Sequence, residues 1–211
     1  MNLETIHAST GAAIFLKNGI RLASANNPLR EAESWVSKNV NAFEKFDVTV
    51  VLGLGCGYHT HWASLKFPLN KIVVLEPDLN VIKWVKAEGP TQGKKVKILN
   101  IIDQDSILSS PELRTRLCEL YSVVRHPASF QVERSILATL EATLLGRTAA
   151  SLKFLMKLNP ELSAHAAKLE KALGVMDGPL SIKDVARAMA VDHLKLGKFG
   201  GITRILRELV R

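Results

Sequence analysis

The chain has 211 residues, of which 47% are hydrophobic and 23% charged, with a formal net charge of +8 and an isoelectric point near 9.6. This length is enough to bury a core without disulfides or metal ions, and the composition excludes an intrinsically disordered chain. Cys56 and Cys118 are the only cysteines, so neither a disulfide framework nor a zinc site is expected. The first residues lack the pattern of a signal peptide and no apolar run could cross a bilayer, so we expect a cytoplasmic protein without membrane insertion.

The positive charge is concentrated near the end of the sequence. Between Ser181 and Arg211 there are seven Lys or Arg residues and three acidic ones. A basic excess attracts nucleic acid, anionic lipid or an acidic partner, although an exposed, solvated face is the simpler explanation.

The first 46 residues are expected to form a small β meander followed by a helix. Short strands are predicted at Leu3–Ala8, Ala12–Leu16 and Ile20–Ser24, with a turn at Lys17-Asn18-Gly19. Asn27-Pro28 then provides a helix cap and a first-turn proline, and the helix should continue to about Phe46.

Strands alternate with helices over residues 47–130. The predicted strands are Val48–Leu54, Lys71–Glu76, Val96–Ile102 and Tyr121–Arg125, and the helices between them are Tyr58–Lys66, Leu79–Glu88 and Pro111–Leu120. Continuous apolar strands of this kind are typical of a sheet covered on both faces. We therefore predict a Rossmann-like, three-layer α/β/α fold with a mostly parallel sheet, an N-terminal β meander and a helical C-terminal region.

The pattern changes after Pro127, and residues 131–211 are predicted to form a helical C-terminal region. Residues Gln131–Val175 are helix-forming, and two further helices are predicted at Ile182–Ala190 and Gly200–Leu209. These long helices leave room for a homodimer. The last two resemble a helix-turn-helix whose second helix is basic. Such a motif would bind DNA mainly through the DNA phosphates.

The main chemical signal is the glycine-rich turn after Val51. Gly53, Gly55 and Gly57 allow a sharp reversal between strand and helix and a close approach of the backbone to a ligand. The row has neither the GxGxxG spacing of a dinucleotide site nor the GK[ST] of a P-loop. A tight turn without any ligand is the alternative.

The row VLGLGCGYH resembles motif I of class I S-adenosylmethionine-dependent methyltransferases, whose usual form is VLDxGCGxG. Gly53 replaces the usual acidic residue and His59 the last glycine. The resemblance implies that Glu76, at the end of the second central strand, binds the ribose and that Asp103 or Asp105 lies near the adenine. The cofactor-contacting residues that we expect on this basis are Gly53, Gly55, Cys56, Gly57, Tyr58, Glu76, Pro77, Asp78, Asp103 and His126.

A second resemblance covers residues 1–130. The segments LASANNPLREAESWV, VVLGLGCGYH, IVVLEPDLNVIKWV and VVRHPAS resemble the N-terminal Rossmann-like domain of the motility accessory factor family. That family is associated with glycosylation of flagellin, which implies a role in a glycan pathway. Asn26 and Asn27 replace the Tyr and Asp of the family's HSxYDPxxEA segment. No counterpart of the large central domain that follows in that family is expected within these 211 residues.

Three histidines are expected at the carboxyl edge of the sheet. His59 and His61 follow the glycines and His126 follows the fourth strand, where one of them could act as a general base. Capping of loops or helices is the simpler role, and no metal site is expected. Arg125-His126-Pro127-Ala128 lacks the amide or carboxylate of base-methylating enzymes, which argues against methylation of nucleic-acid bases.

Three functional hypotheses follow. The first is a methyltransferase-like protein that binds S-adenosylmethionine as a small-molecule, nucleotide-type ligand and whose acceptor is unknown. The second is a non-catalytic nucleotide or sugar-nucleotide binding module related to the flagellin glycosylation factors. The third, and least favoured, is a DNA-associated factor that uses the basic C-terminal helices.

Overall fold

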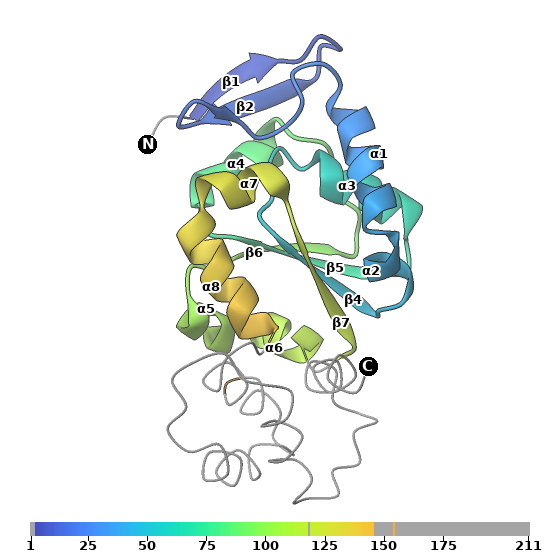
Figure 1. Ribbon diagram of the computed structural model, residues 1–211, viewed down its shortest axis with the longest axis vertical. Coiled ribbons are helices and arrows are strands. Elements are labelled where there is room, and N and C mark those ends of the chain that lie inside the picture. The colour runs from blue at the N-terminus through green and yellow to red at the C-terminus, as the bar shows by residue number, and fades with distance from the viewer. Residues whose placement is uncertain (1–2, 118, 146–153, 155–211) are drawn as a thin grey trace, which may run out of the picture. The chain divides into compact units, whose positions relative to one another are not determined.

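The computed structural model describes residues 3–117, 119–145 and 154 (Figure 1). The chain divides into two units, one of Met1–Ser106 and Ser122–Ala138, the other of Ile107–Tyr121 and Thr139–Arg211. Each unit is described by itself. Within the described residues, no helix combines the length and hydrophobicity that a membrane span requires.

The predicted β meander is confirmed at the start of the first unit. Strands β1 (Leu3–His7), β2 (Ala13–Lys17) and β3 (Ile20–Arg21) form an antiparallel sheet in the order β1-β2-β3. Asn18 and Gly19 connect β2 to β3 with φ angles of 51° and 77°, the positive values that a tight hairpin turn needs. The third strand ends at Arg21, earlier than the predicted Ser24.

The single helix predicted from Pro28 to about Phe46 is wrong, because the structure has two helices there. Helix α1 covers Pro28–Lys38 and α2 covers Val40–Glu44. Asn39 separates them, and its side-chain amide donates to the Trp35 carbonyl at 2.8 Å. An asparagine that competes for a backbone carbonyl in this way disfavours a continuous helix. The start was predicted correctly, since Asn27 caps α1 by accepting from the Arg30 N–H at 2.9 Å.

The central sheet is parallel and confirms the Rossmann-like fold. Its strands are β4 (Val48–Leu52), β5 (Lys71–Glu76), β6 (Val96–Asn100) and β7 (Tyr121–Arg125), in the order β6-β5-β4-β7. Every residue of β4 is buried, as expected of a strand covered on both faces. The chain order reverses between β4 and β7, so their carboxyl ends form the switch point at which ligands of such sheets bind.

The helices that follow the strands agree with the prediction in part. They are α3 (Tyr58–Lys66), α4 (Leu79–Ala87), α5 (Gln104–Ser109), α6 (Pro111–Leu117), α7 (Pro127–Val132) and α8 (Arg134–Leu144). Helix α5 was not predicted, and α7 begins at Pro127, directly after β7, instead of near Gln131. The rest of the helix-forming region to Val175, and the helices expected at Ile182–Ala190 and Gly200–Leu209, lie outside the described residues.

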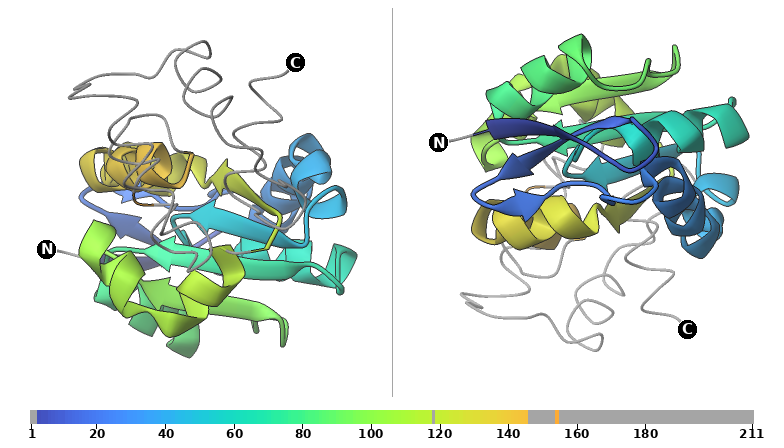
Figure 2. Two further views of the ribbon diagram at one scale, coloured as in Figure 1. Left: turned by 90° about the horizontal axis from the view of Figure 1, so that it is seen from below. Right: turned by 90° about the horizontal axis from the view of Figure 1, so that it is seen from above.

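The meander lies across the carboxyl edge of the central sheet, beside α4 and α7 (Figures 1 and 2). Ile14 and Phe15 of β2 are fully buried in the same hydrophobic core as Val51 and Val74 of the sheet. The Phe15 ring also contacts the Trp84 ring of α4, with 4.6 Å between centroids. The meander is therefore an integral cover of the edge that a ligand would approach.

In the second unit, the described residues make a few internal contacts. The Tyr121 hydroxyl, which is buried, donates to the Leu144 carbonyl at 2.5 Å. Arg116 and Glu119 form an ion pair at 3.4 Å. The site described below belongs wholly to the first unit.

Candidate functional site

The glycine turn between β4 and α3 lies at the switch point and has the backbone geometry that the sequence predicts. Gly53, Gly55 and Gly57 have φ angles of 88°, 56° and 82°, which side-chain-bearing residues adopt at a cost. Gly57 precedes the first residue of α3. The positive φ angles alone would account for three glycines in this row.

Side chains from the start of α7 fill the space against this turn. A Cβ atom on Gly53 would lie 2.2 Å from Cβ of Ser129, and one on Gly55 would lie 2.3 Å from Cε1 of the His126 ring. The Gly55 N–H donates to the Ser129 hydroxyl at 3.0 Å. His126 and Ser129 are 1% and 3% exposed. A ligand lying on Gly53 and Gly55 would have to displace both side chains.

His126 continues this contact into a chain of directional hydrogen bonds. Its Nδ1 accepts from the Ser129 N–H at 3.1 Å and lies 2.9 Å from the Ser129 hydroxyl. Because a backbone N–H can only donate, the neutral His126 ring carries its proton on Nε2, which then donates to Nδ1 of His59 at 3.1 Å. The tautomers of both rings are thereby set by the backbone.

Both histidines are held neutral. Burial lowers the pKa of His59 from 6.5 to about 4. Burial, together with the nearby His59, lowers the pKa of His126 well below 6.5. His59 also meets the Trp35 ring edge-on, with 5.2 Å between centroids. His61, by contrast, bonds to the Thr91 carbonyl at 2.6 Å, away from this pair.

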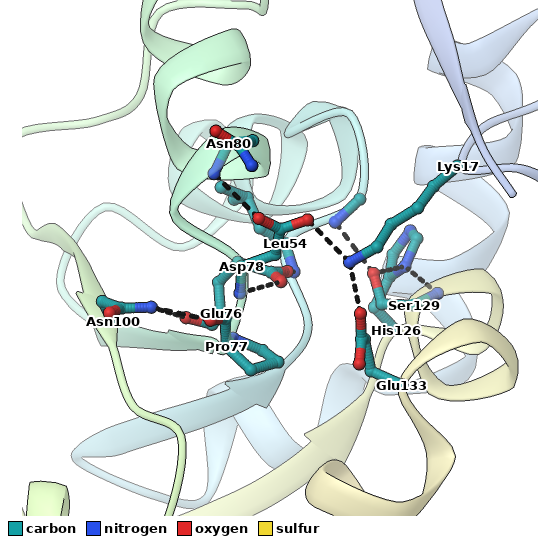
Figure 3. Close-up of polar contacts among 11 residues, drawn as sticks. Lys17, Leu54, Glu76, Pro77, Asp78, Asn80, Asn100, His126, Ser129 and Glu133 are labelled. Carbon is teal, nitrogen blue, oxygen red and sulfur yellow. Dashed lines mark hydrogen bonds and ion pairs between the residues drawn. The ribbon is translucent and has the colours of Figure 1, made fainter. Parts of the chain in front are cut away.

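Glu76 lies at the end of β5, where the sequence places it, and its carboxylate turns toward the glycine turn (Figure 3). One carboxylate oxygen accepts from the Leu54 N–H at 2.8 Å and the other from the Asp78 N–H at 3.0 Å. Burial raises its pKa to about 7, against the effect of these two donors and of Lys17. Both oxygens are thus engaged by the protein's own backbone.

A buried ion cluster joins the meander to this edge. The Lys17 ammonium lies 2.8 Å from a carboxylate oxygen of Asp78 and also pairs with Glu133, which follows α7 (Figure 3). The side chains of the three are 1%, 8% and 20% exposed in that order. Burial opposes the charge on Lys17, but the two carboxylates outweigh it, so its pKa lies above 10.5. Asp78 also caps α4 by accepting from the Asn80 N–H.

Cys56 and Tyr58 face the meander. The Cys56 sulfur accepts from the Phe15 N–H at 3.4 Å, and burial raises the pKa of its thiol to about 12. The Tyr58 hydroxyl donates to the Ala13 carbonyl at 2.8 Å. The thiol is therefore protonated and packed under β2, which is the small buried role that its place between glycines suggests.

The part of the edge beyond β5 and β6 is open to solvent. Glu76 and Asn100 are register partners on these strands, and the Asn100 amide donates to the Glu76 and Pro77 carbonyls at 3.0 and 2.9 Å. Two large apolar side chains near these strand ends, Leu79 and Ile102, are 53% and 52% exposed.

Asp103, the residue expected near an adenine, is at this open part. It is fully exposed and accepts from the Ser106 N–H at 2.7 Å, which starts α5. Hydrogen bonds from Ser106 lower the pKa of Asp103. The carboxylate is therefore charged and accessible.

The residues expected at the site thus fall into two groups. The glycines, Glu76, Asp78 and His126 come together around a buried corner, while Asp103 stands in the open. Lys17, Ser129 and Glu133 were not predicted from the sequence as part of this site. Only Ser129 had a usable signal, since His126-Pro127 places a capping side chain and a first-turn proline before it, the pattern of a helix start that was not used in the prediction. Among the described residues, no group of three His, Cys, Asp or Glu side chains is placed to hold a metal ion.

Comparisons with known proteins do not assign the chain to a family. No protein-family model matches the chain, and no curated protein or solved structure matches it significantly.

Proposed function

We propose that this chain is a non-catalytic Rossmann-like module that binds a nucleoside-type ligand at the open part of its sheet edge. The observation that carries the proposal is the occupation of the glycine turn by His126 and Ser129. In the methyltransferase-like hypothesis, this turn would receive the methionine end of S-adenosylmethionine. The residues present leave no space for it there, so positioning of a methyl donor, on which such catalysis depends, is not supported.

The state of Glu76 argues in the same direction. A ribose would need carboxylate oxygens of Glu76 that it can reach as acceptors, yet each oxygen already accepts from a backbone N–H and the residue is only 2% exposed. Turning the carboxylate toward a ligand would leave those two buried donors without partners, which costs about 1–3 kcal/mol for each. A ligand that depends on Glu76 is therefore disfavoured relative to one that leaves it in place.

The open part offers groups suited to a nucleobase. Leu79 and Ile102 are aliphatic and exposed, and Asp103 is a charged acceptor at the same carboxyl edge of the sheet. A base has apolar faces and polar edges, so aliphatic side chains with one carboxylate form a minimal recognition set for it. The resemblance to flagellin glycosylation factors adds sugar nucleotides to the ligands worth testing.

Calorimetric titration of the full chain with adenosine, a uridine diphosphate sugar and S-adenosylhomocysteine tests the proposal. We expect a nucleoside or sugar nucleotide to bind, and S-adenosylhomocysteine to bind no tighter than adenosine. Asp103→Asn should weaken binding by about tenfold, the loss of one charge-assisted hydrogen bond. Asp47→Asn, which changes an exposed aspartate just before β4, is the matched control and should leave the affinity unchanged.

Two results would overturn this proposal. If none of the nucleosides and sugar nucleotides binds, the proposed class of ligand is wrong. Binding of S-adenosylhomocysteine that is at least 100-fold tighter than that of adenosine, and is lost in Glu76→Ala, would restore the methyltransferase-like hypothesis.

A further inference from the structure

The contact between α7 and the glycine turn is built from hydrogen bonds whose donors and acceptors cannot exchange roles. It begins at the Gly55 N–H, passes through the Ser129 hydroxyl to Nδ1 of His126, and ends on Nδ1 of His59. The Ser129 N–H also points at Nδ1 of His126. Backbone donors stand at two points of this chain, so its direction is fixed.

The two ring nitrogens that accept in this series of hydrogen bonds already face donors, so an added proton would meet another hydrogen. On Nδ1 of His59 it would face the proton on Nε2 of His126, and on Nδ1 of His126 it would face the Ser129 N–H. Among the described residues, no carboxylate contacts either ring to compensate a positive charge. Such a charge, buried and unpaired, is expelled or moves its surroundings.

The charged groups on the neighbouring elements are engaged elsewhere. Glu76 of β5 binds the Leu54 and Asp78 N–H groups, and Glu31 of α1 binds the Ser24 N–H at 2.7 Å. Arg125 of β7 lies over the Phe130 ring. Lys17 of β2, Asp78 before α4 and Glu133 after α7 pair with one another.

We propose that protonation of the His59–His126 pair releases the first turn of α7 from the glycine turn and opens the switch-point corner at acidic pH. The consequence for ligand access rests on the proposed function, because it would add the inner corner to the open part of the same edge. The release itself does not depend on any ligand. The low pKa values of both rings agree with a pair that stays neutral until the contact opens.

The size of the effect follows from His59 alone. With a pKa of about 4 in the closed state and 6.5 in an open one, lowering the pH from about 7 to about 4.5 favours opening by roughly 60-fold. Protonation of His126 would add to this factor.

Amide hydrogen exchange of the full chain at these two pH values, corrected for intrinsic rates, tests the inference. We expect the protection of α7 and the glycine turn to fall by roughly 60-fold, while that of β4 and β5 stays unchanged. Loss of protection in all of these segments together, or in none, would overturn it. Because no ligand is present, failure of nucleoside binding and failure of this device are separate results.

A matched pair of variants assigns the effect to the histidines. In His59→Asn, the amide oxygen takes the place of Nδ1 and can still accept from His126, so the acid-induced loss should shrink at least tenfold. His7→Asn changes an exposed histidine of β1 and should behave as the parent chain. An unchanged acid response in His59→Asn would refute the assignment. Should that variant fail to fold, nitrogen NMR of the parent chain decides: a His126 proton on Nδ1 at neutral pH would also refute it.

Discussion

Replacing Lys17 by methionine probes the buried ion cluster that joins the meander to the sheet edge. Methionine keeps most of the aliphatic volume of lysine and removes its charge, so packing changes little. Asp78 and Glu133 would then remain close together without a counter-ion, and Glu76 would lose the positive charge that favours its ionised form.

The expected cost is large because the cluster is almost closed to water. Lys17 and Asp78 have side chains only 1% and 8% exposed, so solvent screens the charge left on Asp78 poorly. Removing one partner of such a pair typically costs about 3–5 kcal/mol. A typical domain has a total stability of about 5–15 kcal/mol, so this variant should be close to the limit of folding.

Urea unfolding at neutral pH measures this cost. Lys45→Met, at an exposed position after α2, is the matched control and should stay within about 0.5 kcal/mol of the parent chain. The triple variant Lys17→Met, Asp78→Asn, Glu133→Gln should recover much of the loss, because no unpaired charge remains. A loss below about 1 kcal/mol for Lys17→Met, or a triple variant as unstable as the single one, would show that the charges are not the cause.

Two further predictions concern the glycine turn and its surroundings. Burial raises the pKa of Glu76 from 4.5 to about 7, so the contribution of Glu76 to stability falls by about 3 kcal/mol as the pH rises through that window. Burial lowers the pKa of His59 from 6.5 to about 4, so the contribution of His59 to stability falls as the pH drops from 6.5 to about 4. Because the two trends oppose each other, Glu76→Gln should make urea-derived stability rise more steeply between about pH 5 and 6.5 than in the parent chain, and equal slopes would contradict the shift. Gly11→Ala should cost about 1–2 kcal/mol from its positive φ alone, while Gly55→Ala should cost about 1–3 kcal/mol more, because its Cβ would meet the His126 ring. Equal losses in the two alanine variants would show that the ring moves away freely.

The architecture could be predicted from local features of the sequence. Apolar runs such as Val48–Leu54 and Lys71–Glu76 predicted buried parallel strands, and Asn27-Pro28 predicted the start of α1. These signals are local, because strand burial and helix capping depend on residues close in the chain. The break at Asn39 was missed, since an asparagine is compatible with a helix until its amide bonds to a backbone carbonyl.

The role of the glycines could not be predicted in the same way. Their spacing indicated a turn bare enough for a ligand, and the turn is present. Which atoms lie against it depends on Ser129, which is 74 positions away from Gly55 in the sequence. The same bare backbone serves a ligand or an internal side chain equally well, so the pattern alone left both interpretations open.

The burial of Lys17 could not be predicted from the sequence. In the sequence it belongs to a turn beside Asn18-Gly19, and an isolated lysine is expected to be solvated. Its burial depends on Asp78 and Glu133, which α4 and the end of α7 bring to the same point. The sequence by itself determined the strands, the starts of α1, α3, α4 and α6 and the place of the switch point, because short-range periodicity and backbone sterics encode them. Only the tertiary structure decided what fills that edge, because a charge is buried or a glycine covered through partners that are distant along the chain.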